Sequence, residues 1–467
     1  MRAQALRFRR SLTLVGLSVV APGSAQFTAG NRQLGKVVLR VWAGLIVVGG
    51  LVLWLVPVDV LAGLMVRPWL LTLLKLLIFV IGIGWIALVV DAWRLGYPPG
   101  LRRRHRLVMV GTTLALCALV ATPLLVAVRY ASAARDAVVA MFPSGEAAAA
   151  SDGRLNVLLL GADAGNGRIG VRPDSIHLVS IDIRSGRPLL VSLPRNLEKA
   201  RFPEGSAAAD RFPDGFSGAG DREEWMLNAT WTYGEANPDL FPGPAGPGVT
   251  AVEQAVEGTL GLPVHYFVAI DLDGFRDLVD ALGGVTIRVT EDIPIGDGGR
   301  VLEAGLHELD GYETLWYARS RSGSSDYARM ARQRCVLGAI VHEVDPSTVL
   351  RNFTALAAAS TSIVTTDIPQ GQLPELVEMA WTAKGLPVAS LQLVPPLVDP
   401  ADPDFAAIAQ HVDDAVETSQ TASTEPDPIP EATAGATEPS EQPSADEAAA
   451  DGEPTPTSDL ASACSYA

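Results

Sequence analysis

Three long apolar stretches near the N-terminus constrain the fold of this 467-residue chain more than any other feature. Each is close to the ~20 residues that a helix needs to cross a bilayer. The stretches cover residues 37–58, 68–91 and 107–128. We therefore expect an α-helical membrane anchor over residues 1–135.

A shorter apolar run, residues 11–20, precedes these stretches and ends at Pro22 and Gly23. It is too short for a full span, which favours a re-entrant or interfacial segment over residues 11–29. A signal peptide is the alternative, because the run follows several arginines.

The basic residues of the short loops predict the orientation. Five arginines lie in the loop 92–106, and Arg32 and Lys36 precede the first stretch, whereas the loop 59–67 contains only Arg67. Loops rich in Lys and Arg stay in the cytoplasm. Three spans would then make this a multi-pass protein of the cell membrane, with everything after about residue 128 outside the cytoplasm.

Charge divides the chain further. Residues 1–135 contain 16 Lys and Arg against 2 Asp and Glu, whereas residues 399–467 contain 16 Asp and Glu and no Lys or Arg. The formal net charge of −16 argues against a nucleic-acid binder, since phosphate neutralisation requires a basic face. The acidic Thr/Ser/Pro/Ala-rich end has few large apolar residues, which predicts a disordered tail over residues 411–467.

Between anchor and tail we expect a linker over residues 136–154 and a folded extracytoplasmic domain over residues 155–410. Its motif-rich core, residues 155–345, alternates strand-like and helix-like patterns. Strands are expected at 155–161, 175–183, 188–194, 265–271 and 285–289. The helix GFRDLVDAL, capped by Asp271 or Asp273, lies between the last two. This mixture predicts an α/β fold, an α/β/α sandwich around a mixed sheet.

Two acids and a group of arginines are the candidate site. Asp163 follows the first strand and Asp174 precedes the second. Carboxylate oxygens without His or Cys nearby suit magnesium, although acids beside loops are more often caps and turns. The three cysteines are too few for a disulfide scaffold, and the sequence leaves open whether Cys335 and Cys464 pair.

The segment YARSRSGSSDYARMARQR, residues 317–334, concentrates five arginines around one acid, Asp326. A helix capped by Ser324 or Ser325 would place Arg329, Arg332 and Gln333 on one face. Met330, Leu337 and Val341 would form its buried stripe. A solvated helix face is the alternative interpretation, but Arg195, at the end of a strand, favours a polyphosphate site. One guanidinium group can donate two hydrogen bonds at once to the oxygens of a phosphate.

The order of these motifs resembles the LytR-CpsA-Psr family of cell-wall enzymes, most closely its actinobacterial multi-span members. The matching segments are LLLGADAG and VRPDSIHLVSID (within 158–182), VSLPRN (191–196), LNATWTYG (227–234), HYFVAIDLDGFRDLVDALGGVTIRV (265–289), GLHELDGYETLWYARSR (305–321) and SDYARMARQR (325–334).

The resemblance implies a magnesium-dependent phosphotransferase that moves a glycopolymer from a polyprenyl-pyrophosphate carrier to a peptidoglycan hydroxyl outside the membrane. It implies that Asp163 and Asp174 bind the metal. It implies that the pyrophosphate is bound by the following residues: Arg172, Arg195, Arg319, Arg321, Arg329, Arg332 and Gln333. Catalytic roles fall to Arg195, Arg319, Arg321 and Asp326.

The sequence departs from the family pattern at two positions. Asn196 stands where the common pattern has Asp, and Ala164 follows Asp163 where many members have Arg. An amide cannot act as a general base, which leaves the base open. A pyrophosphate hydrolase acting on the same lipid carriers, a non-catalytic binder of anionic wall polymer and a membrane-bound regulator are the alternative functions.

Overall fold

The computed structural model describes residues 2–96, 102–145, 147–162, 172–296, 299–320, 325–343, 364–383, 386–421, 457–460 and 464. Contacts divide the chain into two compact units. The first unit comprises Met1–Ala140 and Leu373–Glu378, and the second comprises Met141–Gln372 and Met379–Ala467.

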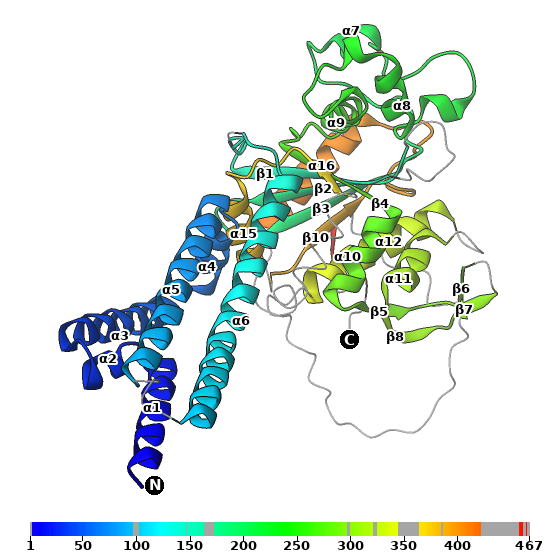
Figure 1. Cartoon of the computed structure of the whole chain (residues 1–467). Coiled ribbons are helices and arrows are strands. Elements are labelled where there is room, and N and C mark those ends of the chain that lie inside the picture. The colour runs from blue at the N-terminus through cyan, green and yellow to red at the C-terminus, as the bar shows by residue number, and fades with distance from the viewer. Residues whose placement is uncertain are drawn as a thin grey trace, which may run out of the picture. The chain divides into compact units, whose positions relative to one another are not determined.

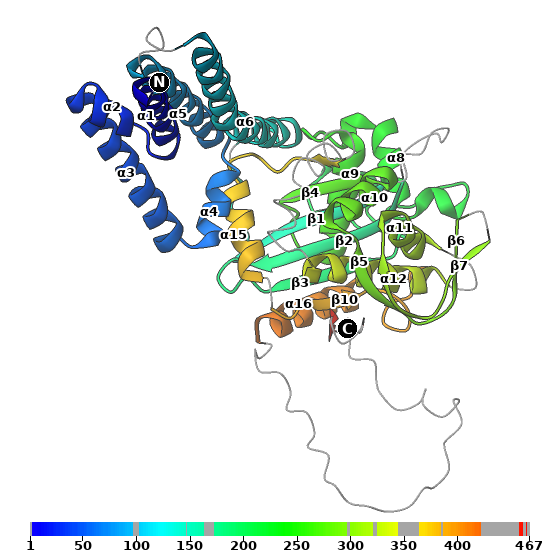
Figure 2. The same ribbon diagram turned by 60° about the horizontal axis from the view of Figure 1, so that its bottom comes forward.

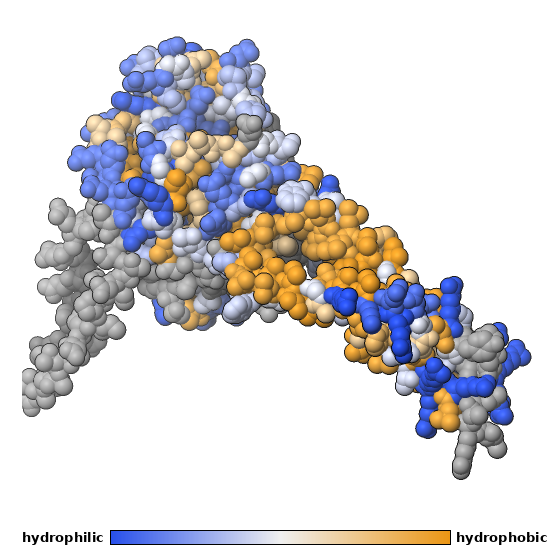
Figure 3. All heavy atoms as spheres, turned by 90° about the vertical axis from the view of Figure 1, so that its left-hand side faces the viewer, coloured by the Kyte–Doolittle hydropathy of each residue, from blue (hydrophilic) through white to orange (hydrophobic). Residues whose placement is uncertain are grey.

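The first unit is helical. Its helices are α1 (Arg2–Val20), α2 (Ser24–Ala29), α3 (Arg32–Leu55), α4 (Val58–Met65), α5 (Pro68–Leu95) and most of α6 (Arg103–Met141). Among the described residues, α3, α5 and α6 are long and apolar enough to cross a membrane. Helices α5 and α6 contain the predicted stretches 68–91 and 107–128, whereas α3 contains only residues 37–55 of the stretch 37–58. Hydrophobic side chains gather over this unit, with hydrophilic ones at its end (Figure 3). Such a surface suits a membrane anchor.

The short N-terminal run lies in α1, which packs against α5. Ser11 Oγ donates to the Gly96 carbonyl at 2.7 Å, and Trp85 Nε1 donates to the Ser18 carbonyl at 3.1 Å. The helix ends before Pro22, and Gly23 adopts a positive φ of 93° that favours glycine. The run is therefore part of the helical unit's packing.

The second unit is built on a seven-stranded mixed sheet in the order β11-β10-β3-β2-β1-β4-β9. The strands are β1 (Arg154–Ala162), β2 (Pro173–Asp182), β3 (Pro188–Leu193), β4 (Tyr266–Asp271), β9 (Val364–Thr366), β10 (Ala389–Gln392) and β11 (Thr457–Asp459). The strand β1 pairs antiparallel with β2 and parallel with β4. The mixed sheet predicted from the sequence is confirmed.

Helices cover both faces of this sheet (Figures 1 and 2). Along β3, Leu189 and Val191 point into the main core, where α9 (Pro247–Leu260) and α16 (Phe405–Thr421) pack. Leu190 points to the other face, where residues of α12 (Asp326–Glu343) pack. Because successive strand residues alternate between faces, a continuous apolar run is buried on both sides.

Two smaller groups of elements extend this sandwich. One contains α7 (Ala207–Arg211), the 3-10 helices η2 (Arg222–Trp225) and η3 (Pro238–Leu240), and α8 (Ala229–Ala236). The other contains α10 (Leu272–Leu282), α11 (Gly311–Arg319) and two hairpin-like pairs, β5 (Val285–Val289) with β8 (Gly305–Leu309) and β6 (Ile293–Ile295) with β7 (Arg300–Leu302). The expected strand at 285–289 therefore belongs to a separate small sheet. Helix α15 (Leu373–Ala383) completes the described elements.

The boundary of the acidic tail was predicted wrongly. Residues 411–421 are helical and belong to α16. Ile408, Val412 and Ala415 are fully buried, and their spacing places them on one helix face. Residues 457–459 form the edge strand β11. Composition averaged over the whole tail hides these short apolar patterns.

Candidate functional site: an arginine and carboxylate cluster

The two ends of neighbouring strands bring the first pair of site residues together. Ile176 of β2 lies opposite Leu193 of β3, so the start of β2 lies beside the end of β3. Asp174 occupies that start, and Arg195 follows that end after Pro194. The Arg195 guanidinium donates through Nη1 to Asp174 Oδ1. Residues 21 positions apart thus form one ion pair.

Helix α12 adds a second acid and a second arginine. Asp326 Oδ2 lies 3.4 Å from Arg195 Nε, and its Oδ1 lies 3.0 Å from Arg329 Nη2. Arg329 Nη2 also donates to the Asp174 carbonyl at 3.5 Å. The Arg329 side chain is only 2% exposed, so its charge depends on these partners. Ser325 caps the helix by accepting from Ala328 N at 3.2 Å, which places Asp326 in the first turn.

These four residues form the cluster Asp174–Arg195–Asp326–Arg329, with two positive and two negative charges. Asp174 and Asp326 keep 35% and 26% of their side chains exposed, and Arg195 keeps 24%. The positive and negative charges of the cluster are therefore equal in number, and three of its four side chains remain accessible to solvent. Bound phosphates would meet both the guanidinium forks and the carboxylates.

Arg332 lies on the same helix but has different contacts. Its Nε donates to the Tyr317 carbonyl at 3.0 Å, and its Nη2 donates to the Ser320 carbonyl. These carbonyls end α11, so Arg332 caps that helix and fixes the position at which Arg319 ends it. The Arg319 guanidinium lies 5.8 Å from the centre of the Trp316 ring. These contacts of Arg319 and Arg332 are with α11.

The remaining predicted residues are placed as follows. Arg172 Nη1 donates to the Glu223 carbonyl at 3.3 Å, so its contact is with η2. Gln333 of α12 is partly buried, and its Oε1 is inaccessible to solvent. Asp163 and Arg321 lie outside the described residues. Of the residues predicted to meet at one site, the structure brings Asp174, Arg195, Asp326 and Arg329 together. The functional roles of all the predicted site residues stay predictions.

The buried face of α12 differs from the predicted one. Met330 is buried as expected, but Val341 is 50% exposed. Arg329 and Arg332 are buried instead, on the side where Val336 and Ala339 pack into the small core of β5 and α11. Arginines that pair with acids and helix-end carbonyls can occupy a buried stripe that hydrophobicity alone assigns to apolar residues.

A further polar strip lies under α12. His177 of β2 is buried, and its Nδ1 lies 2.9 Å from Ser192 Oγ of β3. Burial, reinforced by the nearby Arg334 charge, lowers the pKa of His177 to about 4. Arg334 Nη1 in turn donates to Ser390 Oγ of β10 at 3.0 Å. This strip was not predicted from the sequence, although polar residues within otherwise apolar strands were a visible signal.

The residues present fit a magnesium ion in part. Asp174 is partly exposed, and Arg195 occupies its Oδ1, which leaves Oδ2 for a metal. Within the described part of the chain, no group of three or more His, Cys, Asp or Glu side chains could hold a metal ion. Magnesium is commonly bound by one or two carboxylates with water and substrate phosphates, so this donor set is compatible with it.

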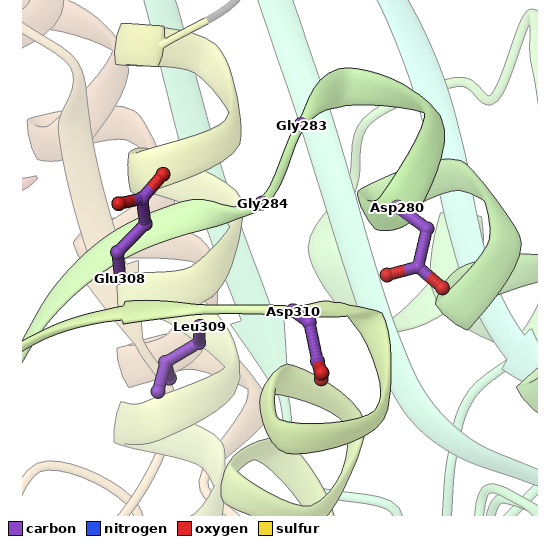
Figure 4. Close-up of a pocket in the computed structure, with 6 residues that line it drawn as sticks. All are labelled: Asp280, Gly283, Gly284, Glu308, Leu309 and Asp310. Atoms are coloured by element: carbon purple, nitrogen blue, oxygen red, sulfur yellow. The ribbon is translucent and has the colours of Figure 1, made fainter.

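The second unit also contains a hollow of about 320 Å³ that is unsuited to phosphate. Asp280, Glu308 and Asp310 line it together with Gly283, Gly284 and Leu309 (Figure 4). Asp280 Oδ1 accepts from Gly311 N at 2.7 Å, and Asp310 Oδ1 accepts from Glu313 N at 2.8 Å. These acids thus anchor the start of α11, at the end opposite Arg319, and their charge would repel an anion.

The fold and the cluster together define an α/β domain with paired arginines and acids, in a chain that also contains an apolar helical unit. A model of the LytR_cpsA_psr family matches residues 127–394. The chain belongs to this family.

Curated relatives share its sequence over part of their length. The chain is 29% identical over 191 residues to the polyisoprenyl-teichoic acid–peptidoglycan teichoic acid transferase TagU of Oceanobacillus iheyensis, covering 40% of this chain and 51% of the relative. The transferase of the same name from Enterococcus faecalis is 29% identical over 217 residues, or 46% and 61% of the two chains. The chain thus spans between half and two thirds of these relatives.

Two solved structures are also similar. TagV of B. subtilis superposes with a TM-score of 0.42 at 21% identity, over 58% of this chain and 98% of that one. The LytR-Csp2A-Psr enzyme from Actinomyces oris gives a TM-score of 0.40 at 20% identity, over 59% and 96%.

Proposed function

We propose that the protein is a phosphotransferase that moves a glycopolymer from a polyprenyl-pyrophosphate carrier to a hydroxyl group of peptidoglycan. Two supports are its family and the names of its relatives, which are transferases from polyisoprenyl-linked teichoic acid to peptidoglycan. The observation that carries the proposal is the convergence of Arg195 and Arg329 beside Asp174 and Asp326, from β2, the segment after β3 and α12.

The cluster suits phosphoryl transfer. In this reaction the protein mainly positions the reacting groups and supplies charge at the phosphate oxygens. The acceptor hydroxyl oxygen attacks the sugar-proximal phosphorus. A new oxygen–phosphorus bond forms, and the bond to the bridging oxygen breaks, so that polyprenyl phosphate leaves. Arg195 binds the oxygens that gain charge, because its guanidinium is partly exposed at the centre of the cluster.

The acids have two roles in this scheme. Asp326 orients Arg195 and Arg329, since it pairs with both. Asp174, and Asp163 by resemblance, would hold magnesium, which supplies positive charge that lets carboxylates and phosphates share one site. The acceptor's proton passes to one of the site's carboxylates, with Asp326 favoured because a metal-bound carboxylate is the poorer base.

In this proposal the helical unit anchors the transferase at the membrane. With α3, α5 and α6 as spans and the basic loops in the cytoplasm, the second unit lies outside. The donor is a membrane lipid, so an anchored domain meets it at a high effective concentration.

The test uses the full-length protein in liposomes that contain a polyprenyl-pyrophosphate-linked glycan. Release of polyprenyl phosphate with magnesium, and coupling of the glycan to added peptidoglycan fragments, would support the proposal. Release without coupling would establish a hydrolase instead, and binding without release a non-catalytic binder. The variant Arg195→Lys, which keeps the charge and loses the fork, should lose most of the activity, and Arg222→Lys on the exposed surface is its matched control.

A further inference from the structure

A segment near the C-terminus, of which the structure describes residues 457–460 and 464, is attached to the helix that carries Arg329 and Arg332. Cys464 forms a disulfide with Cys335 of α12, across a sequence separation of 129 residues. The sequence left this pairing open. Cys335 lies six positions after Arg329 and three after Arg332, which corresponds to about 9 Å and 4.5 Å along a helix.

The same segment is part of the main sheet. The strand β11 pairs antiparallel with β10, with Ser458 opposite Ser390, and Leu460 N donates to the Val388 carbonyl at 2.9 Å. Leu460 is 3% exposed and Cys464 is 6% exposed. Both pack with Leu190 of β3 in a small separate core, against which Cys335 and Leu337 also lie.

These contacts fix α12 against β10 and β3. Arg334, adjacent to Cys335, donates to Ser390 of β10, and β10 pairs with β3, which leads into Arg195. The disulfide, the polar contact at Ser390 and the Leu190 core therefore hold one point of α12 on the sheet. The arginines of α12 are placed relative to Arg195 through this point.

We propose that the Cys335–Cys464 disulfide is a positioning link for the arginine helix, so that pyrophosphate binding depends on the oxidised state of this pair. The inference rests on the proposed function only for the ligand. To form the link, the two thiols transfer two electrons and two protons to an external disulfide, which leaves as a dithiol after a mixed-disulfide intermediate. An oxidising exterior supplies such a disulfide as the electron acceptor.

The experiment uses the full-length protein in detergent micelles, in a Cys117→Ser background, because Cys117 is the one cysteine of the sequence besides Cys335 and Cys464. Without reductant this variant should show no reactive thiol, and after reduction it should show two. Hydrogen exchange of the α12 amides should become at least about tenfold faster on reduction, and binding of inorganic pyrophosphate should weaken at least about tenfold. Reoxidation should restore both.

The matched control is the triple variant Cys117→Ser/Cys335→Ser/Cys464→Ser, which should behave like the reduced protein and ignore the reductant. Circular dichroism shows whether the triple variant has unfolded. If it has, the comparison of the reduced with the oxidised Cys117→Ser protein alone serves as the test. Two reactive thiols before reduction, or equal exchange of α12 in both redox states, would overturn the inference. Equal pyrophosphate binding in both states would also overturn it. If neither state binds pyrophosphate, the proposed function is in error, and the exchange of α12 alone decides the positioning role.

Discussion

Replacing Glu253 by Gln should make the folded domain less sensitive to rising pH. Glu253 lies on α9, where burial is the main cause that raises its pKa to about 8, and the charges of Asp367 and Glu257 add to the effect. These two neighbours accept bonds from Phe267 N and Val264 N, at 2.8 and 2.7 Å. At neutral pH the Glu253 carboxyl is therefore protonated in the folded state and ionised in the unfolded state.

The sign follows from linkage. The folded-state pKa lies above the unfolded value of 4.5, so the folded state binds the proton more tightly. The stability contributed by the neutral group is fully present below pH 4.5 and decreases as pH rises toward 8. One proton corresponds to about 1.4 kcal/mol per pH unit, so the loss between pH 5 and pH 7 is about 3 kcal/mol. The Gln side chain does not ionise and escapes this loss.

Urea unfolding of the full-length protein in detergent, followed by tryptophan fluorescence between pH 5 and pH 8, measures the effect. Trp231 lies against Gly248 of α9 and reports on this region. The Glu253→Gln variant should gain about 3 kcal/mol on the wild type between pH 5 and pH 7. The exposed Glu204→Gln is the control and should follow the wild type. A difference between Glu253→Gln and wild type that stays constant with pH would refute the reasoning.

Three further predictions concern the cluster. Asp326→Ala removes the carboxylate that pairs with the 2%-exposed Arg329, and it should lower the free energy of unfolding in urea by about 3–5 kcal/mol. A loss below about 1 kcal/mol would mean that Arg329 does not depend on Asp326. Arg195→Ala should lower the turnover of the lipid donor about 100-fold or more without unfolding the domain, and normal turnover would remove Arg195 from the site. Asp174→Asn should raise the magnesium concentration for half-maximal activity at least about tenfold, and an unchanged magnesium titration would exclude Asp174 as a ligand.

Much of the architecture was predictable from local patterns. The long apolar helices follow from runs of apolar residues, and the main strands follow from short apolar runs bounded by turns, because both signals depend only on neighbours in sequence. Residues 411–421 were wrongly assigned to the tail because apolar residues are few among them. Ile408 and Val412 become a core face only when a sheet is present for α16 to cover.

By itself, the sequence determined the apolar helices, the mixed α/β domain and which arginines and acids lie near strand ends. Only the tertiary structure decided which of them meet. The antiparallel pairing of β2 with β3 brings Asp174 to Arg195, and the seating of α12 adds Asp326 and Arg329 while turning Arg332 toward α11. The physical reason is that ion pairs, disulfides and buried charges depend on distances of a few ångströms between residues far apart in the chain, and sequence spacing does not encode those distances.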